Sequence, residues 1–234
     1  MNSFDIEKAG ELAKKIDYTF KNIKLLEEAL SHPSLKQQSK QGTRQLSYER
    51  LELLGDAVLG FIITEILFVK FPHYNEGEIA KIKAYLVSKD SLLRAANRID
   101  LPSYIIMTQG EENGGGRGNP GNIENTMEAL IASVYLDGEI VAAKKLINSL
   151  WQDLLENINF SEVDPKTSLQ EWCQSDRHII PHYEIIDKKG PAHMPIFTVK
   201  VFAGSLACTG SGRSIKLAEK SAARNLLAKI RVNS

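Results

Sequence analysis

The sequence predicts two domains of different class: an all-α domain, followed by a small α+β domain with the element order α-β-β-β-α. Three observations support this prediction. Apolar residues recur at helical spacing in the first part, apolar and polar residues alternate in two stretches after residue 180, and the net charge changes sign between the parts. We expect the first domain to cover residues 1–157, a linker 158–163 and the second domain 164–234.

The composition is that of a globular protein, with 43% hydrophobic and 25% charged residues. The charges are unevenly divided although the net charge is zero. Residues 1–160 hold 18 Lys and Arg against 22 Asp and Glu, whereas residues 161–234 hold 11 against 7. Acidic clusters can hold hard cations and basic surfaces attract phosphates, so the two parts are expected to do different work.

A membrane protein and a secreted protein are not expected. The longest apolar run, Ala57 to Val69, has 13 residues and includes a Thr and a Glu, so it is too short and too polar to span a bilayer. Asp5, Glu7 and Glu11 stand where a secretory signal needs basic and then apolar residues. We therefore expect a cytoplasmic protein with no membrane partner.

In the first domain, four segments have apolar residues at helical spacing. One long apolar segment ends at Phe71-Pro72, and the next begins after an acidic turn at 75–78. The four segments with this spacing are Ile23–Leu30, Leu51–Phe68, Ile79–Ile99 and Met127–Leu155.

A glycine-rich stretch, Gly110 to Gly121, interrupts the helical pattern and is expected to lack regular structure. It is not a nucleotide-binding loop, because no strand precedes it and no Lys-Ser/Thr pair follows it, so no nucleotide cofactor is expected. The two cysteines, Cys173 and Cys208, are too few for a disulfide framework or a four-cysteine zinc site, and we expect both to be buried apolar residues.

A helix-start signal and the alternation of apolar and polar residues predict the elements of the second domain. Asp164-Pro165 is a helix start, with an N-cap residue and a proline at the first helical position. Strands are expected where apolar residues alternate with polar ones. The expected elements are a helix at 166–175, strands at 182–187, 196–202 and 206–209, and a final helix at 214–231.

Three carboxylates share one face of an apolar helix. At about 100° per residue, Glu49, Glu52 and Asp56 fall within about 60° of one another. The neighbouring residues are apolar on nearly every side, which predicts a buried helix. Buried carboxylates are costly unless their charge is compensated, and a magnesium or manganese ion is the cheapest compensation.

A second polar pair, Asn125 and Glu128, shares a face of another apolar helix. If the two helices cross, Glu52, Asp56, Asn125 and Glu128 form one oxygen-lined metal site. The alternative is that these acids pair with Lys and Arg on an exposed face.

The stretch Glu49–Leu59 (ERLELLGDAVL) closely resembles the signature motif of ribonuclease III. The resemblance covers nearly the whole chain and includes the segments 18–21, 29–34, 78–93, 128–132 and 135–137. It implies an all-α endonuclease domain that works as a homodimer. It also implies a magnesium site, in which manganese substitutes, made by Glu52, Asp56, Asn125 and Glu128. Asp56 and Glu128 are implied as catalytic, Glu49 as a supporting acid and Leu53 as a dimer-interface residue.

The implied activity is hydrolysis of phosphodiester bonds in double-stranded RNA, leaving 5′-phosphate and 3′-hydroxyl ends. Ribosomal RNA precursors, with some messenger and transfer RNA precursors, are the expected substrates. Two residues depart from the family pattern: Asn125 replaces an Asp, and Leu53 replaces an aromatic residue. The alternative is a catalytically silent protein that binds double-stranded RNA. Retention of the other acids favours the enzyme.

The segment Lys166 to Arg231 resembles a double-stranded-RNA-binding domain, which reads the shape of A-form RNA. Its last helix should present backbone N–H groups to a phosphate, with Lys216 and Lys220 on one face. The alternatives are that these lysines form an ordinary solvated face and that His193 is a loop histidine with no role. The implied RNA-binding residues are Thr167, Gln170, Glu171, Pro191, His193, Ser211, Arg213, Lys216 and Lys220. His32, before Pro33, is expected to be structural.

Overall fold

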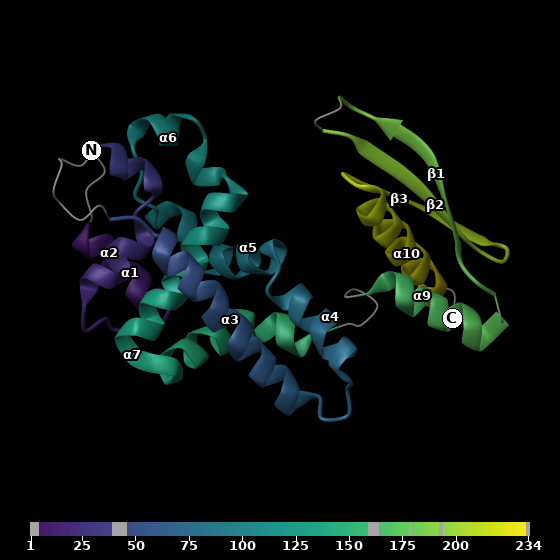
Figure 1. The fold of residues 1–234 in the computed structure, drawn as a ribbon, viewed down its shortest axis with the longest axis horizontal. Coiled ribbons are helices and arrows are strands. Elements are labelled where there is room, and N and C mark those ends of the chain that lie inside the picture. The colour runs from purple at the N-terminus through teal and green to yellow at the C-terminus, as the bar shows by residue number, and fades with distance from the viewer. Residues whose placement is uncertain (1–4, 39–45, 159–163, 178, 192–193, 233–234) are drawn as a thin grey trace. The chain divides into compact units, whose positions relative to one another are not determined.

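The computed structural model describes residues 5–38, 46–158, 164–177, 179–191 and 194–232 (Figure 1). The chain divides into two compact units, Met1–Asn157 and Ile158–Ser234. Residues 159–163, most of the expected linker, lie outside the described residues. In the part of the chain that is described, no helix combines the length and the apolarity needed to cross a membrane.

The first unit is built from helices, as predicted (Figure 1). Asn75 and Glu78 form a reciprocal capping box at the start of α4, where the acidic turn was expected. The α-helices are α1 (Ile6–Lys15), α2 (Ile23–Leu30), α3 (Glu49–Lys70), α4 (Glu76–Leu86), α5 (Lys89–Arg98), α6 (Gln109–Asn113) and α7 (Pro120–Glu156), and the 3-10 helices are η1 (Pro33–Gln38), η2 (Leu101–Tyr104) and η3 (Gly116–Gly118).

The crossing of α3 and α7 is the most extensive helix contact of this unit. At its centre, Gly55 of α3 packs directly on the backbone of Glu128 in α7. A Cβ atom added to Gly55 would overlap the carbonyl group of Glu128 and lie 3.0 Å from its Cα. Because glycine has no side chain at this point, the two helix backbones approach more closely than any other residue would allow.

Helix α7 is kinked at Gly138 and Glu139, whose backbone angles are not helical. The carboxylate of the preceding Asp137 accepts hydrogen bonds from the Tyr18 hydroxyl and from the backbone N–H groups of Lys21 and Asn22, each at 2.8 Å. Burial opposes ionisation of Asp137, but these three donors prevail and hold its pKa below the ordinary value. The kink is therefore fixed to the segment that leads into α2.

The prediction that 110–121 lacks regular structure was wrong. Helix α6 includes Gly110, η3 covers Gly116–Gly118, and α7 begins at Pro120. The Thr108 hydroxyl caps α6 by accepting from the N–H of Glu111. Arg117 fixes the following turn, because it pairs with Glu112 at 2.5 Å and donates to the carbonyl of Pro102 at 2.6 Å. Tertiary hydrogen bonds thus order a segment whose glycines disfavour helix.

The prediction that α3 is buried on nearly every side was also wrong for the single chain. One side packs on α7, but three large apolar side chains on α3 are mostly exposed: Leu53 at 77%, Phe61 at 58% and Phe68 at 72%. Leu53 and Phe61 are eight residues apart, so they share a face of the helix. The apolar composition of α3 therefore reflects two faces, of which only one is covered within this chain.

The second unit has the predicted α-β-β-β-α order. It comprises α9 (Pro165–Arg177), β1 (His182–Lys189), β2 (Ile196–Ala203), β3 (Leu206–Gly212) and α10 (Ile215–Val232). The three strands form an antiparallel sheet in the order β1-β2-β3, and both helices contribute to one core with it (Figure 1). The Asp164 side chain accepts from the N–H of Thr167 at 3.3 Å, which confirms the predicted helix start. Cys173 is buried, as expected, whereas Cys208 is only partly buried.

We predict that Gly55→Ala lowers the free energy of unfolding of the first unit by about 2 kcal/mol or more, because the added methyl group forces α3 away from α7. Denaturant unfolding measures the change. Gly10→Ala in α1 is the matched control. Nothing lies within 4 Å of a Cβ at Gly10, so this variant should be neutral or more stable by up to about 1 kcal/mol. Equal stability of the two variants would contradict the proposed close approach.

Candidate active site and RNA-binding surface

Glu52 and Asp56 on α3 lie close enough to Glu128 on α7, beside the Gly55 contact, for their charges to act on it. Glu128 is only 9% exposed. Burial, and then the negative charges of Asp56, Glu124 and Glu52, raise the pKa of Glu128 to about 8. Burial, with the charges of Glu49 and Glu124, also raises the pKa of Glu52. The acids therefore act on one another electrostatically, and the exposed, fully paired face considered as an alternative does not describe Glu128.

This acidic cluster includes a residue pair that the predicted site did not contain. Glu124 of α7 lies 2.7 Å from the Nζ of Lys89, the first residue of α5. Lys89 is also the cation that opposes the raised pKa of Glu128. Nothing in the sequence pattern linked Lys89 to the acids, since it lies more than thirty residues from either acidic helix segment. It supplies part of the positive charge that the cluster lacks.

The residues fit a hard divalent cation by their chemistry. Among the described residues, no three side chains of His, Cys, Asp or Glu stand close enough to form a ready metal cage. Glu52, Asp56 and Glu128 nevertheless offer only carboxylate oxygens, and a divalent cation would relieve their mutual repulsion. Because Glu128 is protonated at neutral pH without a cation, binding would release a proton from this side chain.

The structure places Asn125 beside Tyr48, the residue that precedes α3. Tyr48 is 2% exposed. Burial and then the charge of Glu52 raise its pKa to about 12, whereas the nearby Asn125 acts to lower it. Asn125 and Glu128 are three residues apart on α7 and so share a face of that helix. Tyr48 was not among the predicted site residues.

Glu49 is held by residues outside the acidic cluster. Its carboxylate accepts from Lys36 Nζ in η1 and from the Ser47 hydroxyl at 2.8 Å. These hydrogen bonds, that of Lys36 first, lower its pKa. Glu49 is therefore ionised at neutral pH, and its negative charge contributes to the raised pKa of Glu52. Its expected role as a supporting acid is compatible with this position.

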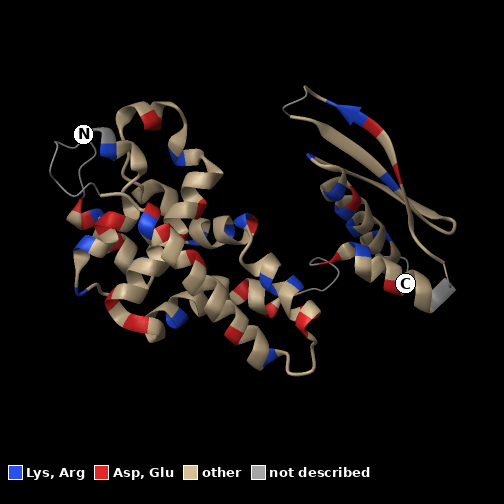
Figure 2. Cartoon of the chain, in the orientation of Figure 1, with Lys and Arg blue, Asp and Glu red and all other residues tan. Residues whose placement is uncertain are grey.

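In the second unit, most predicted RNA-binding residues are solvent-accessible. Arg213 and Lys216 are exposed at the start of α10, and Lys220 is partly exposed one turn later. Ser214 accepts from the N–H of Leu217 at 3.2 Å and so caps this helix. Lys and Arg residues continue along α10 (Figure 2). The result is a basic helix start of the kind that attracts phosphate.

The remaining predicted contacts are distributed over α9 and the strands. Gln170, Glu171 and Pro191 are exposed, but the hydroxyl of Thr167 donates to Asp164 at 2.7 Å and serves the start of α9. The Ser211 hydroxyl lies 3.1 Å from that of Thr198 on the neighbouring strand. His193 lies outside the described residues.

The shifted pKa of Glu128 predicts how stability depends on pH. Between its unfolded value near 4.5 and about 8, the folded chain keeps a proton that the unfolded chain has lost, so stability falls as pH rises through this window. In metal-free buffer, Glu128→Gln should therefore lose less stability than the natural chain between pH 5 and pH 8.5, by up to about 4 kcal/mol. Urea unfolding at both pH values measures this difference.

Glu11→Gln, on the exposed side of α1, is the control and should follow the natural chain. Parallel pH curves for the natural chain and Glu128→Gln would show that Glu128 is not held protonated by the cluster.

Comparison with known proteins agrees with both units. The family described as Ribonuclease-III-like matches residues 22–154, and the family described as Double-stranded RNA binding motif matches residues 165–230. A relative named Ribonuclease 3 from Rickettsia bellii is 52% identical over 227 residues, covering 97% of this chain and all of the relative. Ribonuclease 3 from Rickettsia akari is 51% identical over 216 residues, covering 92% of this chain and 95% of the relative.

Solved structures are similar to the first unit. A crystal structure of the nuclease domain of ribonuclease III from Campylobacter jejuni is 35% identical, with a TM-score of 0.57, and covers 64% of this chain and 97% of that one. A second structure of that domain, described as flexible in the region involved in dimer formation, is 36% identical with a TM-score of 0.56 and covers 61% of this chain and 95% of that one. With a helical nuclease domain, a double-stranded-RNA-binding domain and relatives matched over nearly their full length, this chain belongs to the ribonuclease III family of endoribonucleases.

Proposed function

We propose that this endoribonuclease depends on magnesium and cuts double-stranded RNA by hydrolysis, leaving 5′-phosphate and 3′-hydroxyl ends. The observation that supports the proposal is the electrostatic action of Glu52 and Asp56 on the buried Glu128 at the α3–α7 crossing, where burial and these neighbours raise the pKa of Glu128 to about 8. Acids that repel one another around a buried carboxylate cost stability, and such groups are typical of sites that bind cations or perform chemistry.

Each residue has a proposed task. Glu52, Asp56 and Glu128 would hold the cation through carboxylate oxygens, and Asn125 through its carbonyl oxygen; manganese would substitute for magnesium. When bound, magnesium lowers the pKa of the attacking water and neutralises charge on the phosphoryl oxygens. Asp56 and Glu128 are proposed as the acids that the reaction cannot lose. Glu49 is proposed to support the site from its edge.

We further propose that two copies of the chain associate through α3. Exposed apolar side chains gather there, with Leu53 at 77% and Phe61 at 58% exposure, and a second copy would remove them from water. Two acidic clusters in one dimer would cut the two strands of a duplex at staggered positions. Leu53 fills less space than the aromatic residue usual in the family, so the contact is expected to form with different packing.

The second unit would hold the duplex by its shape. Arg213, Lys216 and Lys220 at the start of α10 supply positive charge for phosphates, and Gln170, Glu171 and Pro191 supply exposed groups for the groove. The proposed substrates are precursors of ribosomal RNA, with some messenger and transfer RNA precursors, which places the activity in the cytoplasm.

The proposed function is tested by Glu128→Gln, which should abolish cleavage of a long RNA duplex in magnesium while leaving duplex binding within about twofold of the natural chain. The reason is that Glu128 belongs to the acidic cluster, whereas the basic contacts lie on the second unit. A cleavage assay and a gel shift on the same RNA measure the two effects. Natural chain that binds but does not cut would instead support a catalytically silent RNA-binding protein.

A salt titration tests the RNA-binding surface. We predict that replacing Lys216 and Lys220 by Ala weakens duplex binding and reduces the log–log salt slope by about 0.7–0.9 for each lost phosphate contact. Lys24→Ala, in the first unit, removes one positive charge outside the proposed surface and is the control for each of the two single substitutions. An unchanged slope in the double variant would mean that this part of α10 is an ordinary solvated face.

A magnesium titration tests Asn125. We predict that Asn125→Asp lowers the magnesium concentration for half-maximal cleavage, because an added carboxylate gives the site one more negative ligand. The rate at saturating magnesium should change less. The opposing effect is repulsion from the nearby Glu124, which would move the midpoint upward. No shift, or a shift to higher magnesium, would show that residue 125 does not face the cation as proposed.

A further inference from the structure

An ion pair joins the two helices that carry most of the proposed RNA contacts of the second unit. Lys166, in the first turn of α9, has its Nζ 2.6 Å from Oε2 of Glu219 on α10. The two side chains are 39% and 24% exposed, so the pair is partly shielded from water. An ion pair in this position holds more firmly than one on the open surface, because less water competes for the two charges.

The aromatic ring of Tyr183 on β1 is a second partner of Lys166. The Nζ of Lys166 lies 4.7 Å from the centre of this ring, within the range of a cation–π contact. Tyr183 in turn packs against the core that includes Leu169 of α9 and Ala222 of α10. The ammonium group therefore has one partner on the sheet and one on α10.

Each member of the ion pair lies beside residues that are proposed to contact RNA. Lys166 is four residues before the exposed Gln170, so the two share a face of α9. Glu219 is three residues after Lys216 and directly before Lys220 on α10. The pair therefore ties the part of α9 that carries Gln170 to the part of α10 that carries the two lysines.

A carboxylate among phosphate-binding lysines is unfavourable by itself. The negative charge of Glu219 would repel a phosphate that Lys216 and Lys220 attract. Lys166 compensates this charge from the other helix, at 2.6 Å. An acid that would weaken RNA binding as an isolated group can thus favour it through the helix arrangement that it stabilises.

A duplex requires the two helices to be placed correctly together. Recognition of A-form RNA combines contacts in a minor groove with contacts to phosphates across the adjoining major groove, and the duplex sets the separation of these two features. In the proposed function α9 supplies groove contacts and α10 supplies phosphate contacts. A helix pair that already has the required spacing binds more tightly, because less conformational freedom is lost on binding.

We propose that Lys166 and Glu219 are positioning residues that hold the groove-contacting part of α9 and the phosphate-contacting part of α10 at the spacing of an RNA duplex. Lys166 directs its charge at Glu219 rather than at a phosphate. This inference rests on the RNA-binding part of the proposed function. Neither residue was among the predicted RNA-binding residues.

The test measures duplex binding by the whole chain over a range of salt concentrations. We expect Lys166→Met to weaken binding by about fivefold, the order of effect of one charged hydrogen bond. The log–log salt slope should not change, because the phosphate-contacting lysines are retained, whereas a lost phosphate contact would lower it by about 0.7–0.9. Lys166→Arg keeps the charge and should bind within about twofold of the natural chain.

Two further variants separate positioning from a general structural role. Glu219→Gln should weaken binding by a similar factor to Lys166→Met, although it removes a negative charge from the RNA-binding face. In a background where Gln170 and Glu171 are both Ala, Lys166→Met should change affinity by less than about twofold, because the groove contacts that it positions are already lost. Thermal unfolding shows which variants are folded, and Glu219→Gln carries the test if Lys166→Met does not fold.

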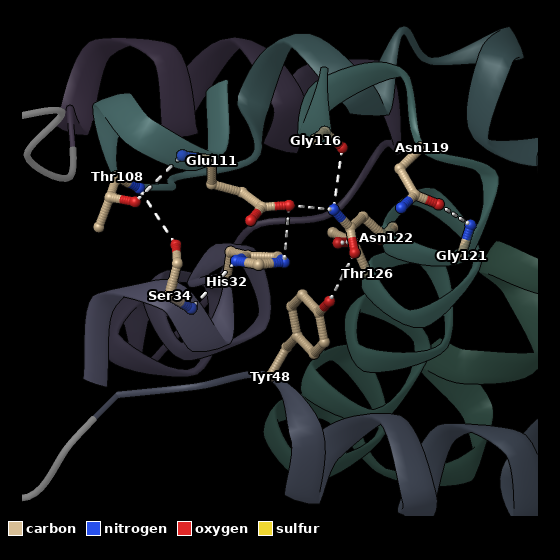
Figure 3. A network of polar contacts seen from close by, with 10 residues as sticks. All are labelled: His32, Ser34, Tyr48, Thr108, Glu111, Gly116, Asn119, Gly121, Asn122 and Thr126. Atoms are coloured by element: carbon tan, nitrogen blue, oxygen red, sulfur yellow. Dashed lines mark hydrogen bonds and ion pairs between the residues drawn. The ribbon is translucent and has the colours of Figure 1, made fainter. Parts of the chain in front are cut away.

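Glu111→Gln is the matched control for Glu219→Gln. Glu111 is also a partly exposed acid that faces a basic side chain, since its Oε1 lies 3.8 Å from Nε2 of His32 in a polar network of the first unit (Figure 3). His32 is buried in this network, which agrees with the structural role expected for it. Glu111→Gln should leave duplex binding within about twofold of the natural chain.

Four results would overturn the inference and leave the proposed function standing. A lower salt slope for Lys166→Met would make Lys166 a direct phosphate contact, and stronger binding by Glu219→Gln would make the acid only a repelling charge. Equal losses from Lys166→Met with and without the groove residues would show a merely structural role, and no loss would show no role. A natural chain that does not bind duplex RNA overturns the proposed function and the inference with it.

Discussion

The close crossing of α3 and α7 at Gly55 is the contact on which the rest of the nuclease domain depends. Gly55 lies against the backbone of Glu128, and the acids before and after Gly55 along α3 are thereby brought to Glu128. A larger residue would move the helices apart and separate these carboxylates. One glycine therefore serves both packing and chemistry: the contact that closes the core also sets the separation of the proposed metal ligands.

The same crossing explains why the site is electrostatically unfavourable without a cation. Burial and three neighbouring acids hold Glu128 protonated at neutral pH, and only Lys89 opposes them among the named causes. If these acids served only the stability of the fold, they would be expected to pair with Lys or Arg side chains. Acids that are kept close together despite their repulsion are instead typical of a site where a bound ligand supplies the compensating positive charge. At the proposed site, Asn125 in place of an aspartate would remove one negative charge from this repulsion.

The periodicity and spacing of residues in the sequence predicted much of the fold and part of the candidate site. The alternation of apolar residues located the first two strands, and the i, i+4 relation of Glu52 and Asp56 predicted that they share a face. The role of Gly55 was not predictable, because a glycine inside a helix gives no local sign of what packs against it. Helix α6 was missed because the hydrogen bonds of Arg117, which order that region, come from tertiary structure. The exposed face of α3 was missed because apolar composition does not distinguish burial within a chain from burial between chains.

The central claim is that the acids at this crossing direct water at a phosphodiester bond of duplex RNA. End-mapping of the products from one defined RNA hairpin tests it most directly. The account predicts magnesium-dependent cuts at staggered positions on the two strands, each leaving a 5′-phosphate and a 3′-hydroxyl. Products ending in 2′,3′-cyclic phosphate would mean that the RNA's own 2′-hydroxyl attacks, and cleavage that persists without a divalent cation would mean that the acids do not act through one; either result would contradict the account.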